Sequence, residues 1–129
     1  MLCSEIYDSA LRLLGESVND GENDDYEERA PYLIASFCNE AGNTDKAWRL
    51  SREFESQGEW NGVCIPLTED FPLSDRFVSA AAFYRAAMLV IDSNESLSDK
   101  LYERFCDAMS TISEEIPAII EAIANRYFD

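Results

Sequence analysis

The sequence contains no histidine and few basic residues: ten lysines and arginines stand against 26 aspartates and glutamates, for a net charge of −16. Histidine most often performs general acid–base catalysis, so its absence removes the commonest catalytic group. The negative charge argues against a nucleic-acid backbone or an anionic membrane as a simple partner. We therefore expect a protein that has no enzymatic activity and needs no cofactor. We also expect it to bind neither a specific nucleic acid nor a membrane.

Metal-binding and targeting patterns are lacking as well. The cysteines match no zinc-binding spacing and form no C-x-x-C pair; they are Cys3, Cys38, Cys64 and Cys106. Cys38 and Cys106 fall within helical apolar patterns, which is typical of buried free thiols. The five glycines are scattered and do not form a phosphate-binding loop. Glu5 and Asp8 interrupt the segment where a signal peptide would need an apolar core, which favours a cytoplasmic site of synthesis.

The 129 residues, of which 47% are hydrophobic, suit one globular domain over residues 1–129. Its most apolar part is a predicted central helix at about 74–92, in which only Arg85 is charged between Phe77 and Ile91. This stretch is shorter than the about 20 apolar residues that a membrane span needs, so we expect a buried helix of a soluble fold. Ser74 is its predicted N-cap.

Helical patterns flank this centre on both sides. Apolar residues recur at helical spacing over 4–14, 25–41 and 98–116, with Gly15 and Gly42 placed to end the first two helices and Ser98 to cap the third. Residues 44–57 could add a helix, and Pro117 suits the start of a last one. The predicted fold is an all-α compact bundle of four or five helices around the central helix.

Residues 58–73 contain Gly62, Pro66 and Pro72 and are predicted to form one long extended connection. Two tryptophans and the main basic cluster lie beside it. A tryptophan in this setting either covers the core or anchors an interface. The candidate partner-binding residues are Lys46, Trp48, Arg49, Arg52 and Trp60.

The order of these segments resembles a known family. IYDSALRLLGE is followed by DYEERAPYLIASFCNEAG, and after a variable stretch by IPLTEDFPLSDRFVSAAAFYRAAMLVID and LYERF. This arrangement is similar to small head–tail connector proteins (adaptor, or head-completion, proteins) of tailed bacteriophages and prophages. The resemblance implies a helical subunit that forms a ring with copies of itself at the portal, contacts portal or tail proteins and lines the DNA channel. It implies assembly in the bacterial cytoplasm and a place in the virion.

Two other classes of function remain open from the residues alone. Carboxylates can imitate phosphates, so a compact chain with a net charge of −16 could be an acidic DNA mimic that occupies a DNA-binding protein. The chain could equally be an intracellular scaffold that binds a basic partner. The small residues at Ala80, Ala81 and Ala82 allow close helix packing, either within the subunit or against another one.

Overall fold

A computed structural model describes residues 1–15, 24–52 and 62–116 of the chain. Over these ranges the chain forms four α-helices and one 3₁₀ turn, and it contains no β-strand there. The elements are α1 (Cys3–Leu13), α2 (Asp24–Ser51), the 3₁₀ turn η2 (Asp75–Phe77), α3 (Val78–Leu89) and α4 (Glu95–Glu114). The predicted all-α bundle is confirmed.

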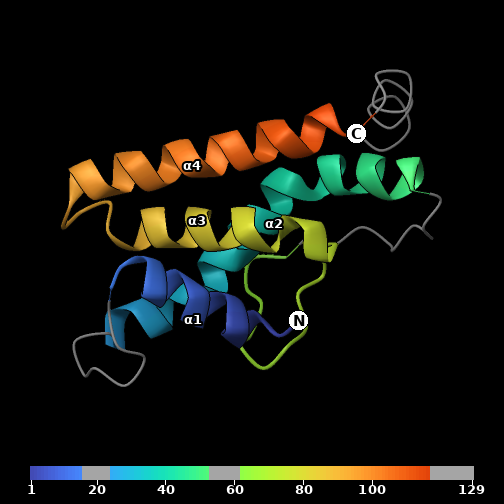
Figure 1. Cartoon of the computed structure of the whole chain (residues 1–129). Helices are drawn as coiled ribbons and strands as arrows, with labels where there is room; N and C mark the ends of the chain where they lie inside the picture. The colour runs from blue at the N-terminus through green and yellow to red at the C-terminus, as the bar shows by residue number, and fades with distance from the viewer. Residues whose placement is uncertain (16–23, 53–61, 117–129) are drawn as a thin grey trace.

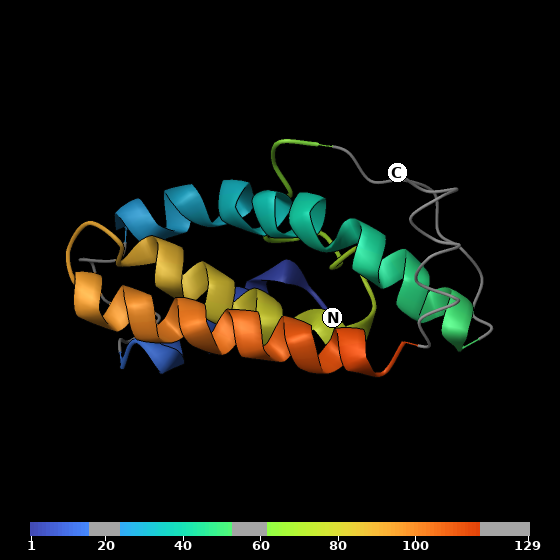
Figure 2. The ribbon, with the colours of Figure 1, turned by 90° about the horizontal axis from the view of Figure 1, so that it is seen from above.

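Helix α3 lies in the middle of the bundle, with α1 on one side, α4 on the other and α2 behind it (Figure 1). Figure 2 shows α3 between α2 and α4, with α2 and α4 running opposite to α1 and α3. Most side chains of α3 are consequently buried, as the sequence predicted, although Ser79 is exposed. Because α3 ends at Leu89, Ile91 lies in the following turn and is exposed rather than buried.

An aromatic cluster joins α2, α3, α4 and the connection before α3. The ring of Phe37 in α2 lies 5.8 Å from Tyr84 in α3 and 6.0 Å from Phe105 in α4, measured between centroids. Phe71, from the connection before α3, lies 6.2 Å from the same ring. Aromatic rings at such separations stabilise a core beyond the area they bury. Phe37 therefore connects three separate segments of the core.

The prediction that Gly42 ends a helix is wrong, because α2 continues through it to Ser51. A glycine inside a helix costs about 1 kcal/mol relative to alanine. Packing on both sides of Gly42 outweighs this cost, since Ala41 and Ala47 are buried against the rest of the bundle. The helix expected over 44–57 is thus the last part of α2, and residues 53–57 lie outside the described ranges.

Two serines predicted to cap helices have other partners. Ser74 makes no side-chain cap and instead donates its hydroxyl to Asp45 Oδ1 at 2.6 Å. The N-cap of α4 is Asn94, whose side chain accepts a hydrogen bond from the amide of Leu97 at 3.1 Å. Ser98 is buried inside α4 and donates to the carbonyl of Ala87 at 2.9 Å. Both serines join separate segments, a role that local sequence does not indicate.

The extended connection is confirmed over residues 62–74, while 58–61 lie outside the described ranges. It runs along the N-terminal segment and accepts hydrogen bonds from two amides of the first turn of α1. The Cys3 amide donates to Glu69 at 2.9 Å and the Ser4 amide to Leu67 at 3.0 Å. First-turn amides have no partner within their own helix, so the connection acts as the cap of α1.

Two arginines bind backbone carbonyls inside the bundle. Arg85 of α3 is completely buried and donates to the carbonyls of Cys3 at 3.0 Å and Ala30 at 3.1 Å. Arg29 of α2 donates to the carbonyls of Met88 and Leu89 at 2.9 and 3.3 Å, where the negative end of the α3 dipole favours a cation. Arg85 thus links α3 to α1 and α2, and Arg29 links α2 to the end of α3.

The cysteines occupy two kinds of environment. Cys3 and Cys38 are buried, and burial raises the pKa of the Cys38 thiol to about 12. Cys64 and Cys106 are exposed. The expectation that Cys106 is a buried thiol on the apolar stripe of its helix is wrong. It lies one position past Phe105, and α4 buries only the narrow stripe that faces α3.

Candidate partner-binding surface

Three elements meet at the end of the bundle where α3 begins. The last turns of α2 lie beside the end of α4, past the first turn of α3 (Figures 1 and 2). Hydrogen bonds join all three elements at this place. The surface formed by Trp48, Arg49, Arg52, Arg76 and Glu115 is called the Trp48 surface below.

Trp48 lies at the centre of this surface and is half-buried. Its inner side packs with the buried Ala47 and Ile116, and its indole Nε1 lies 3.4 Å from Glu115 Oε2. The guanidinium carbon of Arg52 lies 5.5 Å from the centroid of its ring, and Arg52 is exposed. Trp48 therefore covers part of the core and also takes part in an accessible cation–π pair. Its role as an interface anchor stays a prediction.

Arg76 and Glu115 form an ion pair at this surface. Arg76 donates through Nη2 to Glu115 Oε1 at 2.7 Å and through Nε to Oε2 at 3.1 Å, which is the bidentate geometry of a guanidinium on a carboxylate. The hydrogen bond from Arg76 holds the pKa of the Glu115 carboxyl below its ordinary value. The pair fixes the start of α3 to the end of α4.

Asp45 organises the inner edge of the surface. Its carboxylate is buried and accepts hydrogen bonds from the Ser74 amide at 2.9 Å and from Arg49 Nε at 2.9 Å. One acidic side chain of α2 thus holds both the first residues before α3 and a neighbouring arginine. Arg49 and Arg76 both have carboxylate partners, so they contribute directed hydrogen-bond donors more than unneutralised positive charge.

A hollow of about 310 Å³ lies within the surface, between the last turns of α2 and the start of α3. It is lined by Trp48, Arg49, Ser74, Asp75 and Arg76. These groups offer an aromatic ring, guanidiniums and a carboxylate, which together suit the binding of a polar segment of another protein. They include no cysteine or histidine that would serve as a nucleophile or as a general base.

The structure brings together three of the five candidate residues: Trp48, Arg49 and Arg52. Lys46 precedes Trp48 by two residues and therefore lies on a different side of α2. Trp60 lies outside the described ranges. Arg76 and Glu115 were not among the candidate residues, because they come from segments distant in sequence. No local pattern marks two residues that meet only through folding.

No group of three acidic or cysteine side chains in the described ranges is arranged to hold a metal ion. No helix in the described part of the chain combines the length and apolar character needed to cross a membrane. No protein-family model, curated protein or solved structure matches the chain.

Proposed function

We propose that this protein is a non-enzymatic structural protein of a bacteriophage or prophage, a head–tail connector subunit that assembles into a ring at the portal and lines the DNA channel. The order of its segments, which resembles that family, motivates the proposal. The all-α bundle and the extended connection over 62–74 are compatible with such a subunit. It would assemble in the bacterial cytoplasm and enter the virion, with copies of itself and portal or tail proteins as partners.

One observation carries the proposal that the protein works by contacts with other proteins. The exposed guanidinium of Arg52 stacks on the half-buried ring of Trp48, beside the Arg76–Glu115 pair. Tryptophan and arginine are the residues most enriched at energetic centres of protein interfaces. An arginine-rich surface is also unusual in a chain with only ten basic residues. Such a surface fits contact with an acidic region of a partner.

The net charge of −16 bears on both assembly and DNA passage. Like-charged subunits repel one another, so a ring needs local contacts of opposite sign, each worth about 0.2–1 kcal/mol at an exposed position. The buried area around Trp48 would then supply most of the affinity. Acidic side chains on a channel wall would keep DNA from adhering to it.

The experiment is native mass spectrometry combined with light scattering, at high protein concentration and low salt. The parent should form oligomers, and the Trp48→Ala/Arg52→Ala variant should form fewer. Tyr32→Ala is the matched control, because Tyr32 is an exposed aromatic residue of the same helix, away from the Trp48 surface. A strictly monomeric parent would contradict self-assembly and favour an acidic DNA mimic or a scaffold.

A further inference from the structure

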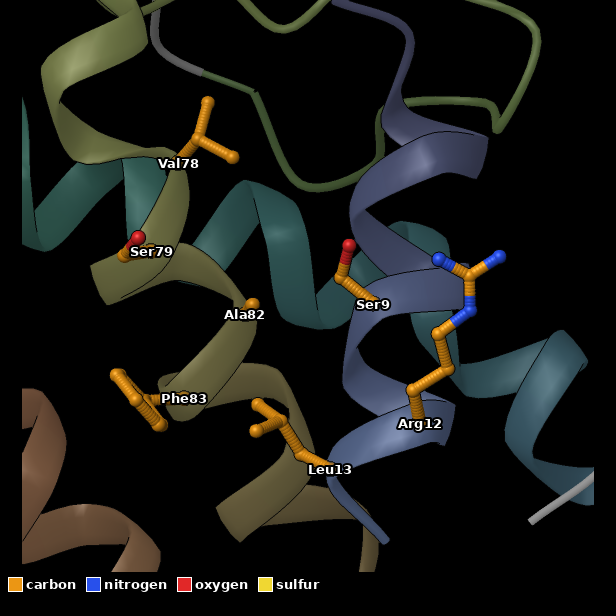
Figure 3. A pocket seen from close by; sticks show the side chains of 7 residues that line it. All are labelled: Ser9, Arg12, Leu13, Val78, Ser79, Ala82 and Phe83. Atoms are coloured by element: carbon orange, nitrogen blue, oxygen red, sulfur yellow. The ribbon is translucent and has the colours of Figure 1, made fainter. Parts of the chain in front are cut away.

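A groove lies on the face of the bundle opposite α2, between α1 and the first half of α3. Its volume is about 240 Å³, and most of its lining is apolar. Figure 3 shows Leu13 reaching from α1 toward Ala82 of α3, with Phe83 on the side of α3 that faces away from α1. Ser79, which is exposed, and Ala82 are small, so the backbone of a second chain can approach α3 closely here.

Positive charge borders this groove on both sides. Arg12 lines it on the side of α1. On the side of α4, the guanidinium carbon of Arg104 lies 5.4 Å from the centroid of the Phe83 ring. An apolar groove between two arginines fits an apolar group that carries negative charge beside it. A second copy of this chain, with 26 acidic residues, offers such a group.

The matching surface lies at the turn between α3 and α4. Ile91 and Tyr102 are two of its large apolar residues, with 47% and 41% of their surface exposed. Both line one hollow of about 360 Å³ together with Asp99, and the exposed Asp92 follows Ile91 directly. Ile91, Asp92, Asp99 and Tyr102 are called the acidic patch below. It combines exposed apolar area with negative charge, and this charge is opposite to that of the arginines that border the groove.

The groove and the acidic patch face different directions. Arg104 and Tyr102 are two residues apart on α4, which places them on opposite sides of that helix. A contact between the groove of one subunit and the patch of the next therefore leaves one groove and one patch free. Such a head-to-tail contact repeats, and it closes into a ring when the rotation per subunit permits.

We infer that the groove between α1 and α3 binds the acidic patch of a second copy of this chain. This inference rests on the proposed self-assembly and adds a second contact between copies of the chain. It is separate from the contact that we propose for the Trp48 surface. The groove supplies apolar area and two guanidiniums, and the patch supplies two apolar side chains and two carboxylates.

A charge exchange tests the inference. One variant reverses the groove (Arg12→Glu with Arg104→Glu) and a second reverses the patch (Asp92→Lys with Asp99→Lys). Each should associate about tenfold or more weakly than the parent, because like charges then face each other across the contact. An equimolar mixture should associate again. In the mixture each reversed groove meets a reversed patch, and each unchanged groove meets an unchanged patch.

Two controls separate this effect from a loss of folding or a general change in charge. Glu27→Lys with Glu40→Lys makes the same change in net charge as the patch variant, on exposed positions of α2, and should not impair association. Ser79→Trp should block the groove without entering the core, since Ser79 is exposed, whereas Ser110→Trp on the exposed side of α4 should not. Thermal melts would verify that every variant is folded.

The possible results are distinguishable by native mass spectrometry. Loss of association in each variant and its recovery in the mixture support the inference. A parent that assembles while both variants and Ser79→Trp assemble equally well overturns the inference but leaves the proposed connector function intact. A parent that stays monomeric at every concentration overturns the inference together with the proposed self-assembly.

Discussion

Two arginines, one in the middle of α3 and one in the turn that leads into it, are accommodated in opposite ways. Arg85 is completely buried, and its hydrogen bonds go to backbone carbonyls of α1 and α2. Within the described residues it has no ion-pair partner. Arg76 keeps about a third of its side chain exposed and forms a bidentate pair with Glu115.

The difference shows how the free-energy cost of placing an arginine depends on whether its guanidinium is buried or partly exposed. Removing a guanidinium from water is expensive, and the burial of Arg85 lowers its pKa from 12.5 to about 10. Its Nε, moreover, finds no hydrogen-bond partner among the residues that the structure describes. The compensation comes from two charged hydrogen bonds and from the ring of Tyr7, whose centroid lies 5.7 Å away. Arg76 loses less hydration and gains less from its pair.

The largest effect is expected for Arg85→Ala, which should cost about 3–4 kcal/mol of unfolding free energy. Two hydrogen bonds from a charged group are lost and a cavity remains, while relief of the buried charge offsets part of the loss. Urea denaturation measures the change. Arg85→Met fills most of the space and should cost about half as much. Equal stability of the parent and Arg85→Ala would contradict the role of Arg85 as a link between helices.

Asp45→Ala should have the second largest effect and cost about 2–3 kcal/mol of unfolding free energy, because it leaves the buried amide and hydroxyl of Ser74 without their acceptor. The same denaturation experiment applies. Asp45→Asn keeps a carbonyl oxygen in place and should lose less. If both variants matched the parent, the junction between α2 and the start of α3 would not depend on this carboxylate.

Cys38, in the same buried region as Arg85, provides a test by pH. Its thiol has a pKa of about 12 in the folded protein and an ordinary value of 9.0 when unfolded. Above pH 9 the unfolded chain releases this proton while the folded chain retains it. The contribution of Cys38 is therefore complete below pH 9 and is lost as the pH rises toward 12.

The measurement is the stability difference between the parent and Cys38→Val at pH 7 and near pH 10. The parent should lose stability relative to the variant over this interval. Arg85 contributes with opposite sign above about pH 10, because its pKa is lowered, so the comparison stays below that value. Cys106→Val, at an exposed thiol, controls for removal of a sulfur atom. A constant difference would show that Cys38 is not protected by burial.

Arg76→Ala should have the smallest effect, since its partner is accessible to water and salt screens the pair. The pKa of Glu115 is lowered, so the stability it contributes is present above its ordinary value and is lost as the pH falls through the lowered one. A double-mutant cycle with Glu115→Ala at pH 7 and pH 3 measures the coupling. Coupling at pH 3 as large as at pH 7 would contradict an ionic pair.

Local patterns sufficed for much of the fold. The apolar spacing over 98–116 predicted the buried stripe of α4, including Leu101, Phe105 and Ile112, because helical period and burial are linked directly. Local patterns were insufficient to predict where helices end and which side chains join separate segments. Gly42 shows this, since a weak local preference for ending a helix was overruled by packing on both sides. Ser74 and Ser98 failed as caps for the same kind of reason, because distant partners bind their hydroxyl groups.

The candidate site was predictable only in part. Trp48, Arg49 and Arg52 were found because they stand close together in one helix, and the two arginines belong to the main basic cluster of the chain. Arg76 and Glu115 complete the surface from segments that only the bundle brings to the same place. Hydrogen bonds across such separations leave no periodic trace in the sequence.

The sequence by itself determined the helical class, the burial of α3 and the excess of negative charge, because these depend on residue type and local spacing. The tertiary structure alone decided where each polar group finds its partner. Arg85 illustrates this best, since its position in an apolar helix was plain from the sequence while its binding to Cys3 and Ala30 was not. A buried donor needs an acceptor at a definite point in space, and only the packing of whole helices creates that point.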